Sequence, residues 1–246
     1  MKHIWLFDVG NSRFKFAPLI EGRVGCDVVA HSYPENHLYH TLEKILPTGD
    51  TAYLASVAPA DITQTFIRAL QHRFTFIERV ITRAHFGDIV VAYPEPERLG
   101  IDRFLALVAA HRAEHVLVVG VGTALTIDLL TAQGRHLGGR ISASPTLMRV
   151  ALHGRAKQLP ETGGNRVIFA TNTEDALASG CEGASIAIIK ESLTTAKKQL
   201  NSPIRLVLHG GGAVAMLSAL SHAEYRPSLV LDGLAIWAAS HSHGQI

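Results

Sequence analysis

Two segments of the chain share one pattern 112 residues apart, counted from Gly10 to Gly122, and this repeat constrains the fold most. The first reads HIWLFDVGNSRFKFAPL and the second reads HVLVVGVGTALTIDLL. Each predicts a strand, a turn with glycine and small polar residues, and a second strand with alternating apolar residues. Aligning the two glycines aligns Asn11 with Thr123. A repeat this long indicates a duplicated domain rather than a solenoid, whose units are much shorter.

The rest of the chain alternates predicted strands and helices. The first half contains a strand TAYLASVA, an amphipathic helix ADITQTFIRALQHRF capped by Asp61, a strand TFIERVI and a helix from near Gly100. The second half contains a long helix from Asn172 or Thr173, a strand IRLVLHGGGA, and LVLDGLAIWAAS, a strand running into a closing helix. This order predicts an α/β fold with mixed sheets flanked by helices, in two halves, 1–112 and 113–246.

Composition excludes several classes of protein. The 246 residues are 47% hydrophobic and 18% charged, which is typical of a soluble globular chain with a sizeable core. The net charge of +2, without runs of like charge, argues against nucleic-acid binding. Of the 14 histidines, His31, His37, His40 and His72 lie in polar surroundings, which is typical of solvated surface residues. Cys26 and Cys181 are too few for a disulfide framework or a thiolate metal cluster, so we expect a reducing cytoplasm. We expect neither a signal peptide nor a membrane span.

The turn after the first predicted strand combines an acid, a glycine and small polar residues, Asp8, Gly10, Asn11 and Ser12. Gly10 would allow a backbone shape that other residues resist and so expose amide groups, while Asn11 and Ser12 add donors. These groups suit a phosphate, and a carboxylate at the strand end could bind a divalent cation that bridges phosphate oxygens. The alternative is a tight hairpin stabilised by an Asx hydrogen bond. The second turn, Gly120–Ala124, favours the phosphate interpretation, because two such turns would form a nucleotide clamp.

Asp102 and Arg103 open a predicted helix in the motif GIDR. An aspartate in the first turn is favoured by the helix dipole in any protein, so a structural role is one interpretation. The other makes Asp102 a general base and Arg103 the holder of an anionic group, because a guanidinium can grip a carboxylate with two hydrogen bonds.

Three further motifs each allow a structural and a functional interpretation. HGGGA, His209–Ala213, follows a predicted strand and is either a loop or part of an adenosine pocket. GGRISASP, Gly138–Pro145, is either an ordinary turn or a functional loop. Asn172 and Thr173 at a helix start form either an N-cap or a contact to a ligand hydroxyl.

Together these motifs resemble those of the type III pantothenate kinases, in the superfamily of acetate kinase, sugar kinases, Hsp70 and actin. The resemblance covers nearly the whole chain and rests on DVGNSRFK, AYPEPERLGIDRFLA, GVGTALTID, GGRIS with LMRVAL, LP at Leu159-Pro160, and NTEDALASG, in that order. It implies two duplicated ribonuclease H-like (actin-like ATPase) domains. The implied reaction converts ATP and pantothenate to 4′-phosphopantothenate, the first committed step of coenzyme A biosynthesis. The resemblance also implies a homodimer whose pocket is built partly by the partner chain.

The resemblance assigns roles residue by residue. The ATP phosphate loop would comprise Asp8, Val9, Gly10, Asn11, Ser12, Arg13, Phe14 and Lys15, with Asp8 near the divalent cation, Mg²⁺, and Thr123 touching ATP from the second turn. The pantothenate pocket would be lined by Tyr93, Gly100, Ile101, Asp102, Arg103 and Thr173. Asp102 would be the base that takes the proton of the substrate hydroxyl.

The sequence departs from the family pattern in two places. Family members usually carry an aspartate three residues before the threonine of the second turn, where it binds K⁺ or NH₄⁺. Here that position, which aligns with Asp8, is Gly120, so we expect weaker monovalent-cation dependence, although Asp128 remains on the following strand. The family's PG after the GGxI element is replaced by Ala143-Ser144.

Two other functions compete with this one. A sugar or N-acetylhexosamine kinase of the same superfamily is disfavoured, because the two distant cysteines cannot form the zinc site of the repressor-type sugar kinases. A non-catalytic, nucleotide-binding accessory or regulatory protein of the same fold is disfavoured by intact Asp8, Asp102 and Thr123 and by the lack of a basic recognition helix.

Overall fold

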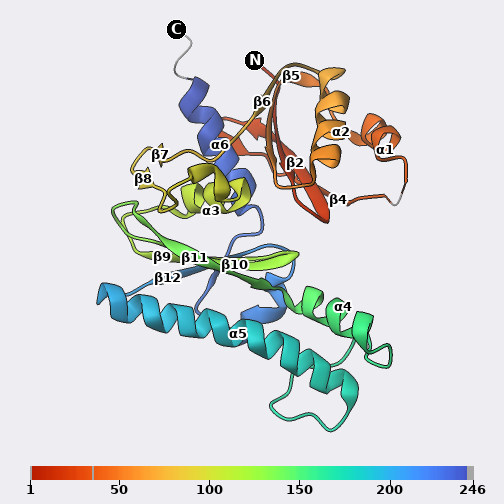
Figure 1. Cartoon of the computed structure of the whole chain (residues 1–246). Coiled ribbons are helices and arrows are strands. Elements are labelled where there is room, and N and C mark those ends of the chain that lie inside the picture. Colours follow the sequence, from red (N-terminus) through yellow and green to blue (C-terminus); the bar gives the residue numbers. More distant parts are fainter. Residues whose placement is uncertain (1, 35, 243–246) are drawn as a thin grey trace. The chain divides into compact units, whose positions relative to one another are not determined.

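The computed structural model describes residues 2–34 and 36–242, which form two compact units (Figure 1). Unit 1 holds the described residues up to Gly87, Tyr93–Ala110, and those from Ser228 onward. Unit 2 holds Asp88–Ala92 and His111–Pro227. The boundary expected near residue 113 lies close to the junction after Ala110, whereas the C-terminal segment packs in unit 1. The assignment of 1–112 and 113–246 as two copies of one domain stays a prediction.

Unit 1 is built on one mixed sheet of order β3-β2-β1-β5-β6, in which β1 and β2 are antiparallel and β5 and β6 run parallel to β1; β4 also pairs with β2. Its strands are β1 (Ile4–Val9), β2 (Arg13–Ile20), β3 (Arg23–Val24), β4 (Val29–Ser32), β5 (Gly49–Ser56), β6 (Phe74–Arg79) and the separate β7 (His85–Phe86). Its helices are α1 (Leu38–Ile45), α2 (Ala60–Gln71), α3 (Ile101–Ala110), α6 (Leu229–Ser242) and the short η1 (Pro96–Arg98). The predicted strands at β5 and β6 and the helix near Gly100 are confirmed.

The alternation of side chains along the β1–β2 hairpin determines on which face of the sheet Asp8 lies. Phe7 and Val9 of β1 and Phe14 of β2 are fully buried in one core cluster, where Phe14 packs edge-on against Phe66 of α2 with ring centroids 4.9 Å apart. Successive side chains of a strand point to opposite faces of the sheet. Asp8 therefore projects from the face of the sheet opposite this core.

Two local predictions in unit 1 are wrong. Helix α2 has Pro59 at its N-cap position, so Asp61 lies in the first turn. The helix dipole stabilises the charge of Asp61 there, but Asp61 is not the N-cap residue. The segment LVLDGLAIWAAS is helical throughout as α6, without the predicted opening strand. A buried apolar run has no polar side to reveal its period, so buried strands and buried helices look alike in sequence.

Close packing against α3 explains a glycine in α6. A Cβ added at Gly233 would lie only 2.0 Å from the backbone oxygen of Leu105, so α6 can approach α3 only with glycine here. Trp237 of the same helix is buried and donates its indole N–H to Glu78 Oε1 at 2.8 Å. These contacts hold the C-terminal helix in unit 1.

Unit 2 repeats the strand pattern of unit 1. Its sheet has the order β11-β10-β9-β12-β13, with an antiparallel β9–β10 hairpin, antiparallel β11, and β12 and β13 parallel to β9. Its strands are β9 (Val116–Val121), β10 (Ala124–Leu130), β11 (His136–Ala143), β12 (Arg205–His209), β13 (Glu224–Tyr225) and the separate β8 (Ile89–Val90). The matching strand orders agree with the repeat in the sequence.

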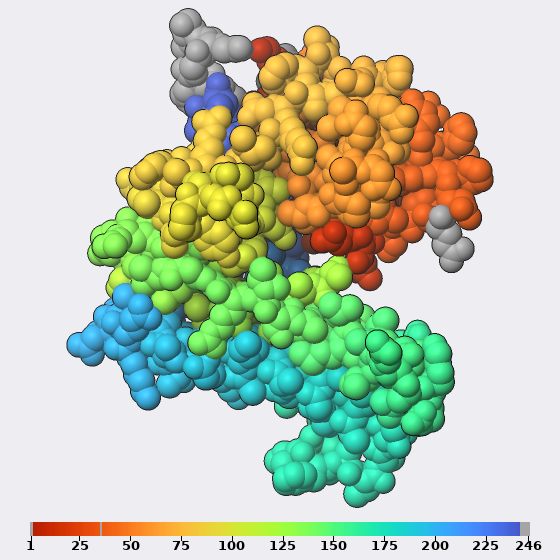
Figure 2. Space-filling model, in the orientation of Figure 1, coloured from red at the N-terminus to blue at the C-terminus, as the bar shows by residue number. Residues whose placement is uncertain are grey.

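Three helices accompany the sheet of unit 2, α4 (Pro145–Arg155), α5 (Thr173–Leu200) and the 3-10 helix η2 (Ala213–Ala219). Helix α5 packs along one face of the sheet, where Ile189 and Leu193 meet the inward residues of β9 and β10 (Figure 1). The segment 156–172 links α4 to α5 and projects from one end of this unit (Figure 2). None of the helices in residues 2–34 and 36–242 combines the length and apolar character that a bilayer span requires.

The segment Gly138–Pro145, for which the sequence allowed an ordinary turn or a functional loop, forms the end of β11 and the start of α4. Ile141 of this segment is the register partner of Thr126 on β10. Ser144 caps α4 by accepting a hydrogen bond from the Leu147 amide at 3.2 Å. Ladder pairing with β10 thus outweighs the turn preference of the glycines, because each pair satisfies backbone groups that a turn would leave to water.

Candidate functional site

The β1–β2 turn presents its polar groups at the end of unit 1's central hairpin. The Gly10 amide donates to the Arg13 carbonyl at 2.9 Å, and Asn11, Ser12 and Arg13 are exposed. Gly10 does not have a positive φ, so the expectation of a special backbone shape is wrong. Space explains the glycine better, because an added Cβ would lie 3.1 Å from the Arg13 carbonyl oxygen.

The predicted phosphate loop divides into two sets of residues. Val9 and Phe14 are buried in the core, so only their backbone groups can face a ligand. Asp8 and Lys15 are register partners on the opposite face of β1 and β2. The loop therefore offers exposed turn amides, one carboxylate and one ammonium, which are the groups that a polyphosphate with a divalent cation requires.

Asp8 is held in an environment that opposes its charge. The pKa of its carboxyl is raised from 3.8 to about 7, mainly by burial and also by the charge of Asp102, while Lys15 acts in the opposite direction. Asp8 as a whole residue is half-buried. Desolvation and a nearby negative charge both disfavour an isolated carboxylate, so this carboxyl is stabilised either by protonation or by a bound cation.

Tyr33 supports the turn from the loop after β4. Its hydroxyl donates to the Gly10 carbonyl at 2.6 Å, and its ring packs against Phe14 and Phe66. Burial and the nearby charge of Asp8 raise the pKa of Tyr33 to about 12, which keeps the hydroxyl a donor. Sequence reasoning missed this residue, because nothing in the local pattern links Tyr33 to a turn 23 residues earlier.

Asp102 lies in the first turn of α3. Its Oδ1 accepts a hydrogen bond from the Arg103 amide at 2.8 Å. The same oxygen would lie 2.6 Å from a Cβ added at Gly100, so the carboxylate occupies the space that this glycine leaves open. Glycine is therefore needed at position 100 to leave room for the Asp102 carboxylate, and not to form a backbone turn.

Arg103 and Tyr93 pack together in unit 1. The Arg103 guanidinium donates to the Tyr93 hydroxyl at 3.1 Å and its Cζ lies 5.8 Å from the centre of the Tyr93 ring. Arg103 is only 6% exposed and Ile101 is 7% exposed. Tyr93, Ile101 and Arg103 of the predicted pantothenate pocket therefore lie in the same unit as Asp102, whereas Thr173 does not.

The β9–β10 turn of unit 2 is the shorter counterpart of the first turn. The Gly122 amide donates to the Ala124 carbonyl at 2.9 Å, and Thr123 is exposed at the tip. The HGGGA motif follows β12 and lies against the end of β9, where the Gly212 amide donates to the Val121 carbonyl at 3.0 Å. Gly210 has φ +89°, so this position does require glycine.

The start of α5 confirms the predicted N-cap. Asn172 Oδ1 accepts from the Asp175 amide at 2.8 Å, and its Nδ2 donates to the Asp175 carboxylate at 2.8 Å. Hydrogen bonds from the backbone amide of Asn165 and the side chain of Asn172 lower the pKa of Asp175. Thr173, the first residue of the helix, is exposed and belongs to unit 2.

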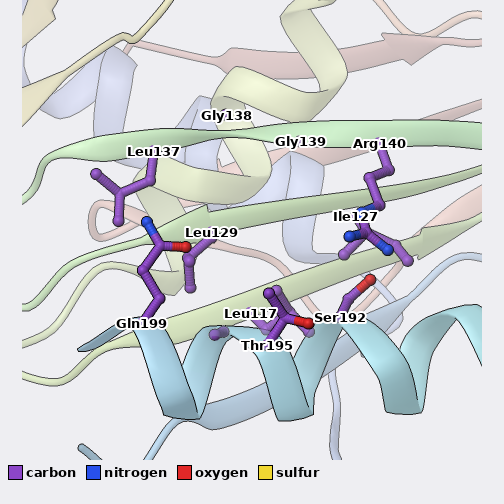
Figure 3. A pocket seen from close by; sticks show the side chains of 11 residues that line it. Leu117, Ile127, Leu129, Leu137, Gly138, Gly139, Arg140, Ser192, Thr195 and Gln199 are labelled. Atoms are coloured by element: carbon purple, nitrogen blue, oxygen red, sulfur yellow. The ribbon is translucent and has the colours of Figure 1, made fainter. Parts of the chain in front are cut away.

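Sequence reasoning also missed a pocket of about 200 Å³ between the sheet of unit 2 and α5 (Figure 3). Side chains from α5 face the strands across it, and Arg140 at one end forms an ion pair with Glu191. The lining residues are Leu117, Ile127, Leu129, Leu137, Gly138, Gly139, Arg140, Ser192, Thr195, Ala196 and Gln199. The lining contains no carboxylate and no residue of the predicted ATP or pantothenate sets.

Solved structures share the fold of this chain at low sequence identity. A Campylobacter jejuni protein described as a Baf-family transcriptional activator aligns with a TM-score of 0.65 at 21% identity, covering 97% of this chain and 99% of that one. A Sinorhizobium meliloti protein described as a 2-dehydro-3-deoxygalactonokinase aligns with a TM-score of 0.57 at 14% identity, covering 99% of this chain and 100% of that one. An archaeal actin homologue aligns with a TM-score of 0.51 at 9% identity, covering 98% and 100%. The predicted actin-like α/β fold is therefore confirmed.

Sequence relatives are much closer. The family model for type III pantothenate kinase matches residues 4–195. Type III pantothenate kinases from Xylella fastidiosa and Stenotrophomonas maltophilia are each 54% identical, over 96% of this chain and 97% of the first protein, and over 98% of this chain and 99% of the second. One from Xanthomonas axonopodis pv. citri is 52% identical over 97% of this chain and 98% of that protein. This chain belongs to the type III pantothenate kinase family.

Proposed function

We propose that this protein transfers the γ-phosphoryl group of ATP to pantothenate, giving 4′-phosphopantothenate, the first committed step of coenzyme A biosynthesis, in the cytoplasm. Family membership supports the reaction. The observation that carries it is the placement of Asp8 and Asp102 in one unit, close enough for one charge to raise the pKa of the other group. Phosphoryl transfer needs mainly positioning and charge neutralisation, which two carboxylates, an ammonium and a set of amides can provide.

Asp102 is the proposed general base. A base must lie within hydrogen-bond reach of the proton that it takes, and the carboxylate of Asp102 stands in the first turn of α3 beside Gly100. Arg103, the residue after Asp102, donates a hydrogen bond to the hydroxyl of Tyr93. These two residues are proposed to line the pantothenate pocket together with Gly100 and Ile101. Thr173 is proposed to contact the same substrate from unit 2.

Asp8 is proposed to hold Mg²⁺ with ATP. Among the described residues no group of three or more His, Cys, Asp or Glu could hold a metal alone. Mg²⁺ is commonly bound through one or two carboxylates plus substrate phosphates, so the donor set around Asp8 fits a cation that arrives with ATP. When bound, the cation neutralises charge that develops on the phosphates. The turn residues Gly10–Arg13 and Lys15, together with Thr123 of unit 2, are proposed to bind the phosphates themselves.

We also propose a homodimer. Unit 2 exposes large apolar side chains on β11, α4 and the linking segment, including Ile168 and Phe169, which are 90% and 92% exposed. An apolar hollow of about 440 Å³ lies nearby, between Met148 and Leu152 of α4 and Leu177 and Cys181 of α5. Exposed apolar patches of this kind mark protein interfaces, and a second copy is the partner that a symmetric contact would use.

Replacing Asp102 with asparagine tests the proposed base. Asn keeps an oxygen for the Arg103 amide, so Asp102→Asn should fold and bind ATP as before while kcat for pantothenate falls about 10²- to 10⁴-fold. Asp61→Asn changes another first-turn aspartate, on the exposed surface of α2, and should leave kcat unchanged. Product formation followed by mass spectrometry distinguishes them; an Asp102→Asn variant that keeps most of the rate rules out the role.

Gly100→Ala tests whether the position of Asp102 matters. The new methyl group would meet Asp102 Oδ1 at 2.6 Å and push the carboxylate aside, which should lower kcat by up to about 10²-fold with little change in melting temperature. The matched control is Gly183→Ala in α5, where nothing lies within 4 Å of an added Cβ. Equal kcat values for Gly100→Ala and the wild type would show that the carboxylate can move without cost.

Phe169→Glu tests the homodimer. A charge on the exposed apolar segment of unit 2 should oppose burial in an interface, so light scattering should give the mass of one chain, where the wild type gives twice that mass. Phe76→Glu alters an exposed phenylalanine of unit 1, which is 55% exposed, and should leave the dimer intact. A monomeric wild type at micromolar concentration would contradict the proposal.

A further inference from the structure

Gly120 lies at the centre of a row of three residues across the sheet of unit 2. Its register partners are Thr126 on β10 and His209 on β12. Its chain neighbours Val119 and Val121 point into the core cluster under α5. Because side chains alternate along a strand, Gly120, Thr126 and His209 share the opposite face of the sheet.

The space beside Gly120 is already filled. A Cβ added there would lie 2.7 Å from Thr126 Oγ1, 2.8 Å from His209 Nε2 and 3.0 Å from His209 Cε1. Contacts that short do not occur between real Cβ atoms and their neighbours, so any side chain at position 120 would have to displace the imidazole or the hydroxyl. The glycine and the histidine therefore fit each other as a pair.

The backbone after β12 restricts movement of His209. A Cβ at Gly210 would lie 2.4 Å from the Val121 carbonyl oxygen, and Gly210 has φ +89°, so the loop is in direct backbone contact with the end of β9. The Gly212 amide donates to that same carbonyl at 3.0 Å. The loop thus fixes the backbone on the C-terminal side of the imidazole.

These residues do not fit a bound alkali cation. Family resemblance implies a carboxylate at position 120, and in unit 1 the equivalent position is Asp8, beside Lys15. Asp128, the acid on the following strand, is buried and paired with His136 at 3.0 Å. Hard cations prefer several oxygen ligands, whereas an imidazole nitrogen suits transition metals.

We infer that His209 occupies the place of the monovalent-cation site and that phosphorylation by this protein does not depend on K⁺ or NH₄⁺. The inference rests on the proposed kinase activity. It goes beyond the missing carboxylate, because it names the side chain that fills the space and explains why aspartate cannot simply be restored at position 120.

The wild-type protein provides the first test. Initial rates are measured in chloride salts of K⁺, NH₄⁺, Na⁺ and tetramethylammonium at one ionic strength, and melting temperatures are measured in the same salts. Initial rates should agree within about twofold in all four salts. A cation that activates by binding would typically change the affinity for a second ligand, here a substrate, about 5- to 150-fold. A steep requirement for K⁺, or a rise in melting temperature specific to K⁺, would overturn the inference. If no salt supports phosphorylation, the proposed function fails, and the melting curves still decide whether K⁺ binds.

Two variants test the role of His209 itself. Gly120→Asp with His209→Ala supplies a carboxylate and removes the imidazole, so this double variant should melt at a higher temperature in K⁺ than in tetramethylammonium. Gly120→Asp alone keeps the imidazole and should be destabilised equally in both salts, because its Cβ meets His209 and Thr126. An equal gain from K⁺ in the single and double variants would contradict the inference. If neither variant folds, the wild-type salt series remains decisive.

Discussion

The unfavourable placement of the Asp8 carboxyl near that of Asp102 is the interaction on which the proposed site depends. Asp8 comes from the central hairpin and Asp102 from the start of α3, so the fold must hold two acids together against desolvation and like charge. Lys15 offsets only part of that opposition. Such a site is disfavoured while empty and favoured once a cation and phosphates arrive, and strained electrostatics of this kind are typical of functional sites.

The surrounding features position these two acids. Core packing of Phe7, Val9 and Phe14 fixes the face from which Asp8 projects. The hydroxyl of Tyr33 holds the adjoining turn through the Gly10 carbonyl, and the missing side chain of Gly100 leaves room for the Asp102 carboxylate. In unit 2 the equivalent row has no acid at all, and an imidazole lies where the carboxylate would be. The two copies of the hairpin therefore share a backbone pattern and differ in charge.

Sequence patterns predicted the features that depend on local spacing. Both hairpins, α3 and the N-cap of α5 follow from alternation, helical period and capping chemistry, and the acids Asp8 and Asp102 were found because they stand at element ends. Features set by distant neighbours were not predictable. The pairing of Ile141 with Thr126 places part of Gly138–Pro145 in a strand, where the motif alone allowed a turn or a functional loop. The strand expected at the start of α6 is helical, and the contacts of Tyr33 and His209 join residues far apart in the chain.

We expect the protein to hold Asp8 with a strongly raised pKa until its cation binds. Carboxyl ¹³C NMR, with Asp8 assigned by comparison with an Asp8→Asn variant, measures this directly. The free protein should show a midpoint of about 7, and addition of Mg²⁺ with a non-hydrolysable ATP analogue should lower it, because a nearby cation favours the ionised form. A midpoint near the ordinary value of 3.8 in the free protein, unchanged by Mg²⁺ and nucleotide, would show that Asp8 is neither held with a raised pKa nor bound to the cation.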